Sequence, residues 1–235
     1  MAVTRAAQRR GQLMSARAIQ VAAFSGRELS LRELKRQDIF FYYSPKLGRR
    51  VTVVEPSRLA LALELEFDPT VLAYVPRPRS LDTQAGGIEL CFWSCTKAGF
   101  EQFYSITSGA TGGSKLEQRR TSLLLAATTA KIALRLEPQA QYLHRATANA
   151  NRLRLLPYVQ IAQQLAQRES ITARILDVFR FQPRQSFHQL ERAVDEFDSR
   201  DVRATACALV HVGQLKLDWN SRLQRYSALE QGDVP

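Results

Sequence analysis

The chain has 235 residues, of which 45% are hydrophobic and 23% are charged, so it is long enough to bury one or two hydrophobic cores. This composition excludes a chain that is disordered along its whole length. The 33 Lys and Arg residues outnumber the 22 Asp and Glu residues, and the resulting net charge of +11 indicates a polyanionic partner, with nucleic acid as the first expectation.

The positive charge is concentrated near the N-terminus. Residues 1–50 hold eleven basic and three acidic side chains, and Arg5, Arg9 and Arg10 cluster at the start. Residues 1–36 are polar and rich in Ala, Arg and Gln, so we predict a basic arm that becomes helical only where a partner binds it. The start lacks the apolar segment of a signal peptide, and no apolar run approaches the length of a membrane helix. We therefore expect a cytoplasmic, nucleoid-associated protein without a membrane partner.

Residues 37–148 have the pattern of a mixed α/β domain. Two runs rich in β-branched and aromatic residues, 39–43 and 51–54, flank a turn sequence and predict a β-hairpin. Leu59, Leu63 and Phe67 recur at every fourth position and predict an amphipathic helix that Asp68-Pro69 ends. Further strands are expected over 71–75, 88–93 and 100–106, and a helix over 116–136.

Two further features of the sequence are given no predicted chemical role. The stretch from Gly109 to Lys115 is glycine-rich, but Ser114 stands where a phosphate-binding loop needs Gly, so nucleotide binding is not predicted. The three cysteines, Cys91, Cys95 and Cys207, have neither a disulfide framework nor the spacing of a zinc site, and we expect buried thiols.

Residues 149–235 form the second predicted domain, which is largely helical. Helices are expected over 153–167, 170–179, 186–197 and 199–212, followed by a strand pair that turns at Asn220-Ser221. Two helices followed by a β-hairpin predict a winged-helix-like domain. Its DNA-binding residues would be Arg200 and Arg203 on the second helix, and Lys216, Arg222 and Arg225 on the wing. A protein-docking or solvated face is the open alternative.

Several stretches resemble TnsA, the endonuclease subunit of heteromeric transposases. Residues 43–57, then Leu65-Glu-Phe-Asp-Pro-Thr-Val71 and Tyr74-Val-Pro-Arg-Pro78, are similar to its N-terminal part, and residues 144–158 are similar to its C-terminal domain. The resemblance covers most of the chain. It implies a restriction-endonuclease-like core followed by a winged-helix-like domain. It also implies three partners: double-stranded DNA at transposon ends, a DDE transposase subunit (TnsB-like) and an AAA+ ATPase (TnsC-like).

The resemblance further implies Mg²⁺-dependent DNA cleavage, but the residues depart from the family's site. That site needs a Glu on the first core helix, an Asp in a Pro-Asp-Phe-like step and a Glu-x-Lys on the strand after. Here the aligned positions are Ala60, Cys91-Phe92-Trp93 and Tyr104-Ser105-Ile106. Because no carboxylate remains at any of them, we expect a catalytically inactive pseudo-endonuclease without catalytic residues, metal or cofactor, which scaffolds its partners at transposon ends.

Two alternatives stay open. In the first, displaced groups rebuild an active Mg²⁺-dependent endonuclease that cuts the non-transferred strands, with Glu64 one turn after Ala60 and with Glu89, Glu101 and Lys97 near the strands. In the second, the chain is a winged-helix DNA-binding regulator unrelated to transposition. Otherwise Glu64 and Glu66 are expected on a solvated helix face. Glu33-Leu34-Lys35 also reads as Glu-x-Lys, but it precedes the core helix and is given no role.

Overall fold

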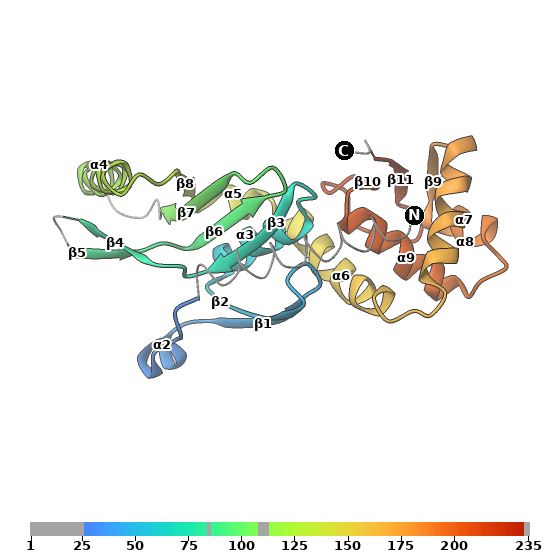
Figure 1. Ribbon diagram of the computed structural model, residues 1–235, viewed down its shortest axis with the longest axis horizontal. Helices are drawn as coiled ribbons and strands as arrows, with labels where there is room; N and C mark the ends of the chain where they lie inside the picture. The colour runs from blue at the N-terminus through green and yellow to red at the C-terminus, as the bar shows by residue number, and fades with distance from the viewer. Residues whose placement is uncertain (1–25, 84–85, 108–112, 233–235) are drawn as a thin grey trace, which may run out of the picture. The chain divides into compact units, whose positions relative to one another are not determined.

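The computed structural model describes residues 26–83, 86–107 and 113–232 (Figure 1). Arg5, Arg9 and Arg10, with most of the predicted basic arm, lie outside the described residues. Within these ranges the chain is mixed α/β, as predicted, and it forms two compact units. The first unit comprises residues 26–42, 50–62 and 70–141, and the second comprises 43–49, 63–69 and 142–232. Two short segments from the N-terminal half therefore belong to the second unit.

The last part of the predicted arm is folded onto the first unit. Helix α2 (Leu31–Arg36) begins after Ser30, whose hydroxyl accepts a hydrogen bond from Glu33 N while the Glu33 carboxylate accepts one from Ser30 N. This capping box satisfies two backbone donors that a helix start otherwise leaves open. The expectation that this stretch becomes helical only on binding is therefore wrong for α2.

The predicted hairpin and the first long helix follow. Strands β1 (Ile39–Ser44) and β2 (Arg49–Val54) pair with each other, and Gly48 between them has a φ of +66°, a conformation that glycine adopts without steric cost. Helix α3 (Pro56–Phe67) has a continuous buried stretch from Ala60 to Leu63. The predicted hairpin and helix are both confirmed.

A four-stranded sheet forms the centre of the first unit, in the order β3-β6-β7-β8. The strands are β3 (Val71–Pro76), β6 (Phe92–Thr96), β7 (Glu101–Thr107) and β8 (Leu134–Pro138). The first three are antiparallel neighbours, and β8 lies parallel to β7. A separate hairpin is made by β4 (Ser80–Thr83) and β5 (Gly86–Glu89). The single strand predicted over 88–93 is therefore two strands, because Glu89 pairs within the hairpin and Phe92 within the central sheet.

The segment between β7 and β8 corrects the helix predicted over 116–136. Helix α4 (Gly113–Thr129) ends before Lys131, whose φ of +52° lies in the left-handed region. The chain then enters β8. Because β8 runs parallel to β7, the two strands need a crossover connection, and α4 lies in that connection. The alternation of apolar and charged residues in Leu134-Arg-Leu136 suits a strand. The helical periodicity used to predict a helix over 116–136 did not reveal this strand.

The core of the first unit is built on β3 and β6. Trp93, Tyr74 and Phe92 are fully buried, and the Tyr74 hydroxyl lies 2.7 Å from that of Tyr42 on β1. The first four residues of β6 are buried on both faces, as expected for a central strand covered from both sides. The start of β6 and the neighbouring part of β7 therefore lie at fixed positions in the unit.

The second unit consists of helices with a small antiparallel sheet (Figure 1). After the short α5 (Ala140–His144), which joins the units, its helices are α6 (Ala146–Ala162), α7 (Arg168–Phe181), α8 (Phe187–Ala193) and α9 (Ser199–His211). Its strands are β9 (Arg184–Ser186), β10 (Leu215–Leu217) and β11 (Ala228–Gln231), in the order β10-β11-β9. The element order from α7 onwards is helix, strand, helix, helix, strand, strand.

Helix α9 is the central helix of the second unit. It contacts α6, α7, α8 and β10, and nine of its residues, including every one from Ala204 to His211, are buried. Gly213 follows it with a φ of +83°, and a Cβ there would lie 2.6 Å from Cβ of Pro69, so only glycine fits. The exposed part of α9 is limited to its first turn.

Glu66 is the most deeply buried carboxylate of the second unit, which overturns the expectation that it lies on a solvated helix face. It accepts hydrogen bonds from Ser44 Oγ and from Lys46 N (2.9 Å), and His211 Nε2 lies 2.8 Å from its Oε1. The His211 ring packs edge-on against Phe67. Glu66 thus joins the turn after β1 to the end of α9. Glu64 is half-buried and pairs with Arg145.

We expect Glu66→Ala to lower the free energy of unfolding by about 3 kcal/mol, because it leaves the buried groups of Ser44, Lys46 and His211 without their common acceptor. Urea denaturation of the full chain measures the difference. The control is Glu230→Ala, which removes an exposed ion pair with Arg184 and should cost less than about 0.5 kcal/mol. A loss no larger than the control's would contradict the role assigned to Glu66.

Candidate functional site

The first unit brings together the strand positions at which the family resemblance places metal ligands. Cys91 N donates a hydrogen bond to Tyr104 O (2.8 Å), and Phe92 is paired with Tyr104 across β6 and β7. Ile106 N also donates to Cys91 Sγ (3.3 Å). Ala60 is buried on α3. The side chains at these positions are a methyl group, a thiol and aliphatic or aromatic groups, none of which is a ligand that Mg²⁺ prefers.

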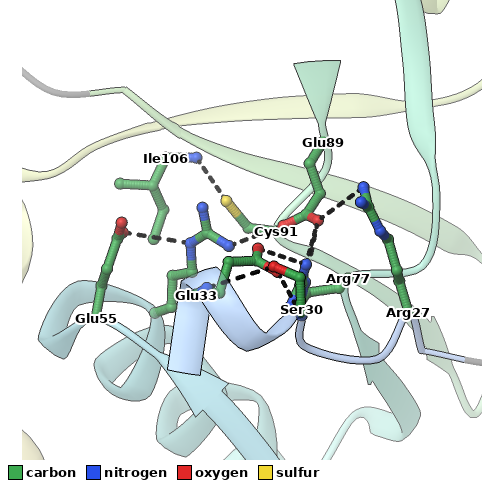
Figure 2. A network of polar contacts seen from close by, with 9 residues as sticks. Arg27, Ser30, Glu33, Glu55, Arg77, Glu89, Cys91 and Ile106 are labelled. Atoms are coloured by element: carbon green, nitrogen blue, oxygen red, sulfur yellow. Dashed lines mark hydrogen bonds and ion pairs between the residues drawn. The ribbon is translucent and has the colours of Figure 1, made fainter. Parts of the chain in front are cut away.

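The nearest carboxylate to Cys91 in sequence is Glu89, and arginines occupy both of its oxygens. Arg58 Nη1 donates to Oε1 (3.1 Å), and Arg77 donates to Oε2 through Nε (3.0 Å) and Nη2 (2.9 Å). Arg27 Nη1 lies 3.7 Å from Oε2. Figure 2 shows this arrangement, with the Glu89 carboxylate between Arg77 and Arg27. Three guanidinium groups therefore converge on one half-buried carboxylate.

Arg77 is the most deeply buried member of this group. Only 4% of its side chain is exposed, and its Nη1 has no hydrogen-bond partner among the described residues. Its φ of +53° lies in the left-handed region, which costs a residue with a Cβ roughly 1 kcal/mol or more. Its backbone is held on both sides, since Arg77 N donates to Cys91 O (2.9 Å) and Arg77 O accepts from Arg27 N (3.0 Å). The surrounding structure thus compensates a strained backbone that aims this guanidinium at Glu89.

Glu33 on α2 supplies a second carboxylate to Arg77. Its Oε1 accepts from Arg77 Nη2 (2.8 Å), while its Oε2 accepts from the Ser30 hydroxyl and backbone. These hydrogen bonds from Ser30, with smaller contributions from the charges of Arg77 and Arg27, hold the pKa of Glu33 below its ordinary value. The Glu33-Leu34-Lys35 sequence, given no role above, thus contributes its first residue to the site, as a partner of arginine.

Arg58 completes the arrangement from α3. Besides Glu89 it pairs with Glu55 (3.4 Å). Burial alone acts to lower the pKa of Arg58, but electrostatic interactions with the Cys91 side chain and with the Glu55 and Glu89 carboxylates outweigh it, and the pKa is raised. Burial raises the pKa of the Cys91 thiol, although Arg58 opposes that effect. We call the set of three arginines and three glutamates the guanidinium cluster: Arg27, Arg58, Arg77, Glu33, Glu55 and Glu89.

The guanidinium cluster does not fit a divalent cation. Its carboxylates already hold guanidinium groups, and a metal bound to Glu89 would have to displace Arg58 or Arg77 and remain next to their positive charges. Among the described residues no group of three or more His, Cys, Asp and Glu side chains is placed to hold a metal ion. The implied Mg²⁺ therefore has no suitable donor set at this site.

The other displaced groups considered from the sequence do not join Glu89. Glu64 belongs to the second unit, where it pairs with Arg145 (3.0 Å) and Arg152 (3.7 Å). Glu101 accepts a hydrogen bond from Trp93 Nε1 (3.0 Å). Lys97 lies exposed in the turn between β6 and β7. Each acidic group thus has its own structural partner.

A groove of about 680 Å³ elsewhere in the first unit lies between α4 and β4. Small and polar side chains such as Ser80, Thr121 and Ser122 line it, and Leu125 lies at its edge. Its lining also includes Arg79, Asp82 and Glu117, and none of the residues of the guanidinium cluster takes part in it.

The predicted DNA-binding residues of the second unit lie in the N-terminal part of α9, on strand β10 and on the β10–β11 connection. Arg200, Lys216 and Arg222 are exposed. Arg203 Nε donates to Glu191 Oε1 (2.7 Å), and Arg225 Nε lies 3.8 Å from Glu191 Oε2, so two of the five residues share one buried carboxylate. Burial acts to lower the pKa of Arg203, but Glu191 outweighs it and the pKa is raised.

Comparison with protein-family models and with curated proteins found no match for the chain in either set. Among the described residues, no helix is both long and apolar enough to cross a membrane.

We expect Glu89→Gln to lower the free energy of unfolding by about 2 kcal/mol, because it leaves the buried Arg77 guanidinium with one fewer negative partner. The matched control is Glu55→Gln, which removes a single, longer contact of a more exposed carboxylate and should change stability by less than about 0.5 kcal/mol. Urea denaturation of both variants beside the natural chain makes the comparison. Equal effects of the two substitutions would contradict the central place of Glu89.

The thiols are expected to be unreactive in the folded chain. Cys91, Cys95 and Cys207 are buried thiols, as predicted, and burial raises the pKa of Cys207 to about 12. Because the thiolate is the reactive form, Ellman's reagent at pH 8 should react with the folded protein at least about 100-fold more slowly than with a free thiol. All three thiols should react once urea unfolds the chain. A fast reaction of one equivalent in the folded protein would show that a thiol is accessible.

Proposed function

We propose that this protein is a DNA-binding, catalytically inactive TnsA-like subunit of a transposition complex. The observation that carries the proposal is the guanidinium cluster, in which arginines pair with Glu89, the carboxylate nearest in sequence to Cys91 and so to one of the positions where the resembled endonucleases hold their metal. In this proposal the nuclease fold is kept as a scaffold and the cleavage chemistry is absent.

The order of elements in the first unit supports the fold part of the proposal. The resembled site needs a helix followed by strands, and α3 is followed by β3, β6 and β7 in one sheet. The positions aligned with the two strand motifs lie on neighbouring strands that pair at Phe92 and Tyr104. We therefore propose a restriction-endonuclease-like core for this unit.

The second unit supports the binding part of the proposal. Its order of helix, strand, helix, helix, strand, strand, with a three-stranded antiparallel sheet, suits a winged-helix-like domain. Exposed Arg200 at the start of α9 and Lys216 and Arg222 near the wing would contact DNA phosphates. The arm residues Arg5, Arg9 and Arg10, with the net charge of +11, would add sequence-independent affinity.

In this proposal the protein assembles a complex and does not cut. It would hold double-stranded DNA at the transposon ends beside a TnsB-like DDE transposase subunit and a TnsC-like AAA+ ATPase. Because the buried cluster needs its carboxylates for Arg58 and Arg77, the fold itself opposes a return of metal binding at this place. Strands that the DDE subunit leaves joined would stay joined unless another nuclease acts.

The test is a cleavage assay with the purified full-length chain and DNA that carries a transposon end. We expect a salt-sensitive shift of the DNA in a gel and no nicking or cutting with Mg²⁺ or Mn²⁺ at protein concentrations that saturate the shift. An unrelated metal-dependent nuclease on the same DNA serves as the positive control. Metal-dependent cleavage that Glu89→Ala or Glu64→Ala abolishes would overturn the inactive assignment, and a chain that shifts no DNA would overturn the binding assignment.

A further inference from the structure

A pocket of about 340 Å³ lies in the second unit between α6, α9 and the segment before β11. We call it the arginine pocket, and its lining residues are Arg154, Tyr158, Phe187, Arg203, Cys207, Leu223, Gln224 and Arg225. Three cationic side chains line it, and no carboxylate is among the lining residues. Its volume is near the lower end of the range for small-ligand pockets and exceeds what a lone inorganic anion needs.

Two of the three cations of the arginine pocket pair with Glu191, which is not itself a lining residue. This carboxylate is only 6% exposed, accepts from Arg203 Nε (2.7 Å) and lies 3.8 Å from Arg225 Nε. Arg203 also hydrogen-bonds the side chain of Tyr158. Two of the three guanidinium groups are therefore oriented before any ligand arrives, which reduces the conformational entropy lost on binding.

Arg154 is the third cation, and it differs from the other two. It lies exposed on α6, and no hydrogen bond or ion pair to another described residue accounts for its charge. Glu191 pairs with only two of the three guanidinium groups, so the pocket keeps an excess positive charge. The remaining wall is largely apolar, with Phe187, Cys207 and Leu223. Such a pocket suits a ligand that carries an anion on one side and an apolar body on the other.

We propose that the arginine pocket binds one nucleotide of DNA, with its phosphate on Arg154, Arg203 and Arg225 and its deoxyribose against the apolar wall. Arginine forms bidentate hydrogen bonds with phosphate oxygens, and a pocket of this volume accommodates a single nucleotide unit. The inference rests on the proposed function, since it specifies where the DNA that the second unit binds is anchored. It also adds Arg154 to the binding residues predicted from the sequence.

The direct test is a titration of the full chain with thymidine 5′-monophosphate, followed by isothermal calorimetry or by NMR shifts of the second unit. Inorganic phosphate and thymidine without phosphate are the two comparison ligands. We expect the nucleotide to bind more tightly than either, and Arg154→Ala to weaken it by about tenfold. Nucleotide binding no tighter than that of inorganic phosphate would show that the pocket recognises only the anion and would overturn the proposal.

The second test measures affinity for duplex DNA as a function of salt. Arg154→Ala should weaken binding and reduce the slope of log affinity against log salt by about one, because one phosphate contact is lost. The control is Arg180→Ala on α7, an exposed arginine outside the pocket, which should leave the slope unchanged. Arg203→Ala is not used, since it would leave the buried Glu191 with fewer partners and could unfold the unit.

The two tests separate the failure of this inference from the failure of the proposed function. If the natural chain binds DNA but Arg154→Ala behaves like Arg180→Ala, the pocket inference is wrong and the DNA-binding proposal stands. If the chain binds no DNA, the proposed function fails, and the pocket is not a DNA site even where the mononucleotide binds. Competition by an acidic peptide but not by the nucleotide would assign the pocket to a protein partner and overturn the inference.

Discussion

A carboxylate buried beside a guanidinium group has to keep that partner, and this constraint organises the first unit around Glu89. The side chain contacts Arg58 on α3 and Arg77 after β3, and Arg77 in turn contacts Glu33 on α2. Removing any one of these charges would leave another uncompensated in a poorly solvated place. The cluster therefore ties a helix, a strand end and the N-terminal segment to one another.

Two carboxylates of the second unit also connect segments that are distant in sequence. Glu66 accepts from Ser44 and Lys46 N and lies against His211, so the end of α3 is joined to the turn after β1 and to α9. Glu191 orients Arg203 and Arg225 at the edge of α9. In each case a buried acid holds groups that are distant in sequence, and in the last case these groups also line a pocket.

These clusters bear on function because the positive charge is neutralised in the first unit and remains in excess in the second. In the first, arginines are neutralised by glutamates where the resembled enzymes need carboxylates for a metal, so the arrangement favours stability over catalysis. In the second, positive charge remains in excess beside an apolar wall, which favours an anionic ligand. The proposed scaffold, which would bind nucleic acid without cutting it, is compatible with both arrangements.

The elements whose signals are local could be predicted from the amino-acid residues alone. The β-branched residues of Val51-Thr-Val-Val54 and the four-residue spacing of Leu59, Leu63 and Phe67 predicted a hairpin and a helix that the structure contains. The sequence also indicated the absence of carboxylates at Ala60, Cys91 and Ile106, since that follows from residue identity alone. These features need only neighbours along the chain.

Which polar side chains meet became known from the folded chain and not from the residue pattern. Glu33 and Arg77 are 44 residues apart, and Glu66 and His211 are 145 apart, so no periodicity relates them. A helical pattern also does not tell which polar positions another segment will cover, and for that reason Glu66 was expected in solvent. The strand nature of Leu134–Pro138 depends likewise on pairing with β7. The physical reason is common to all three: ion pairs, burial and parallel pairing are set by distances in space that the folded backbone alone establishes.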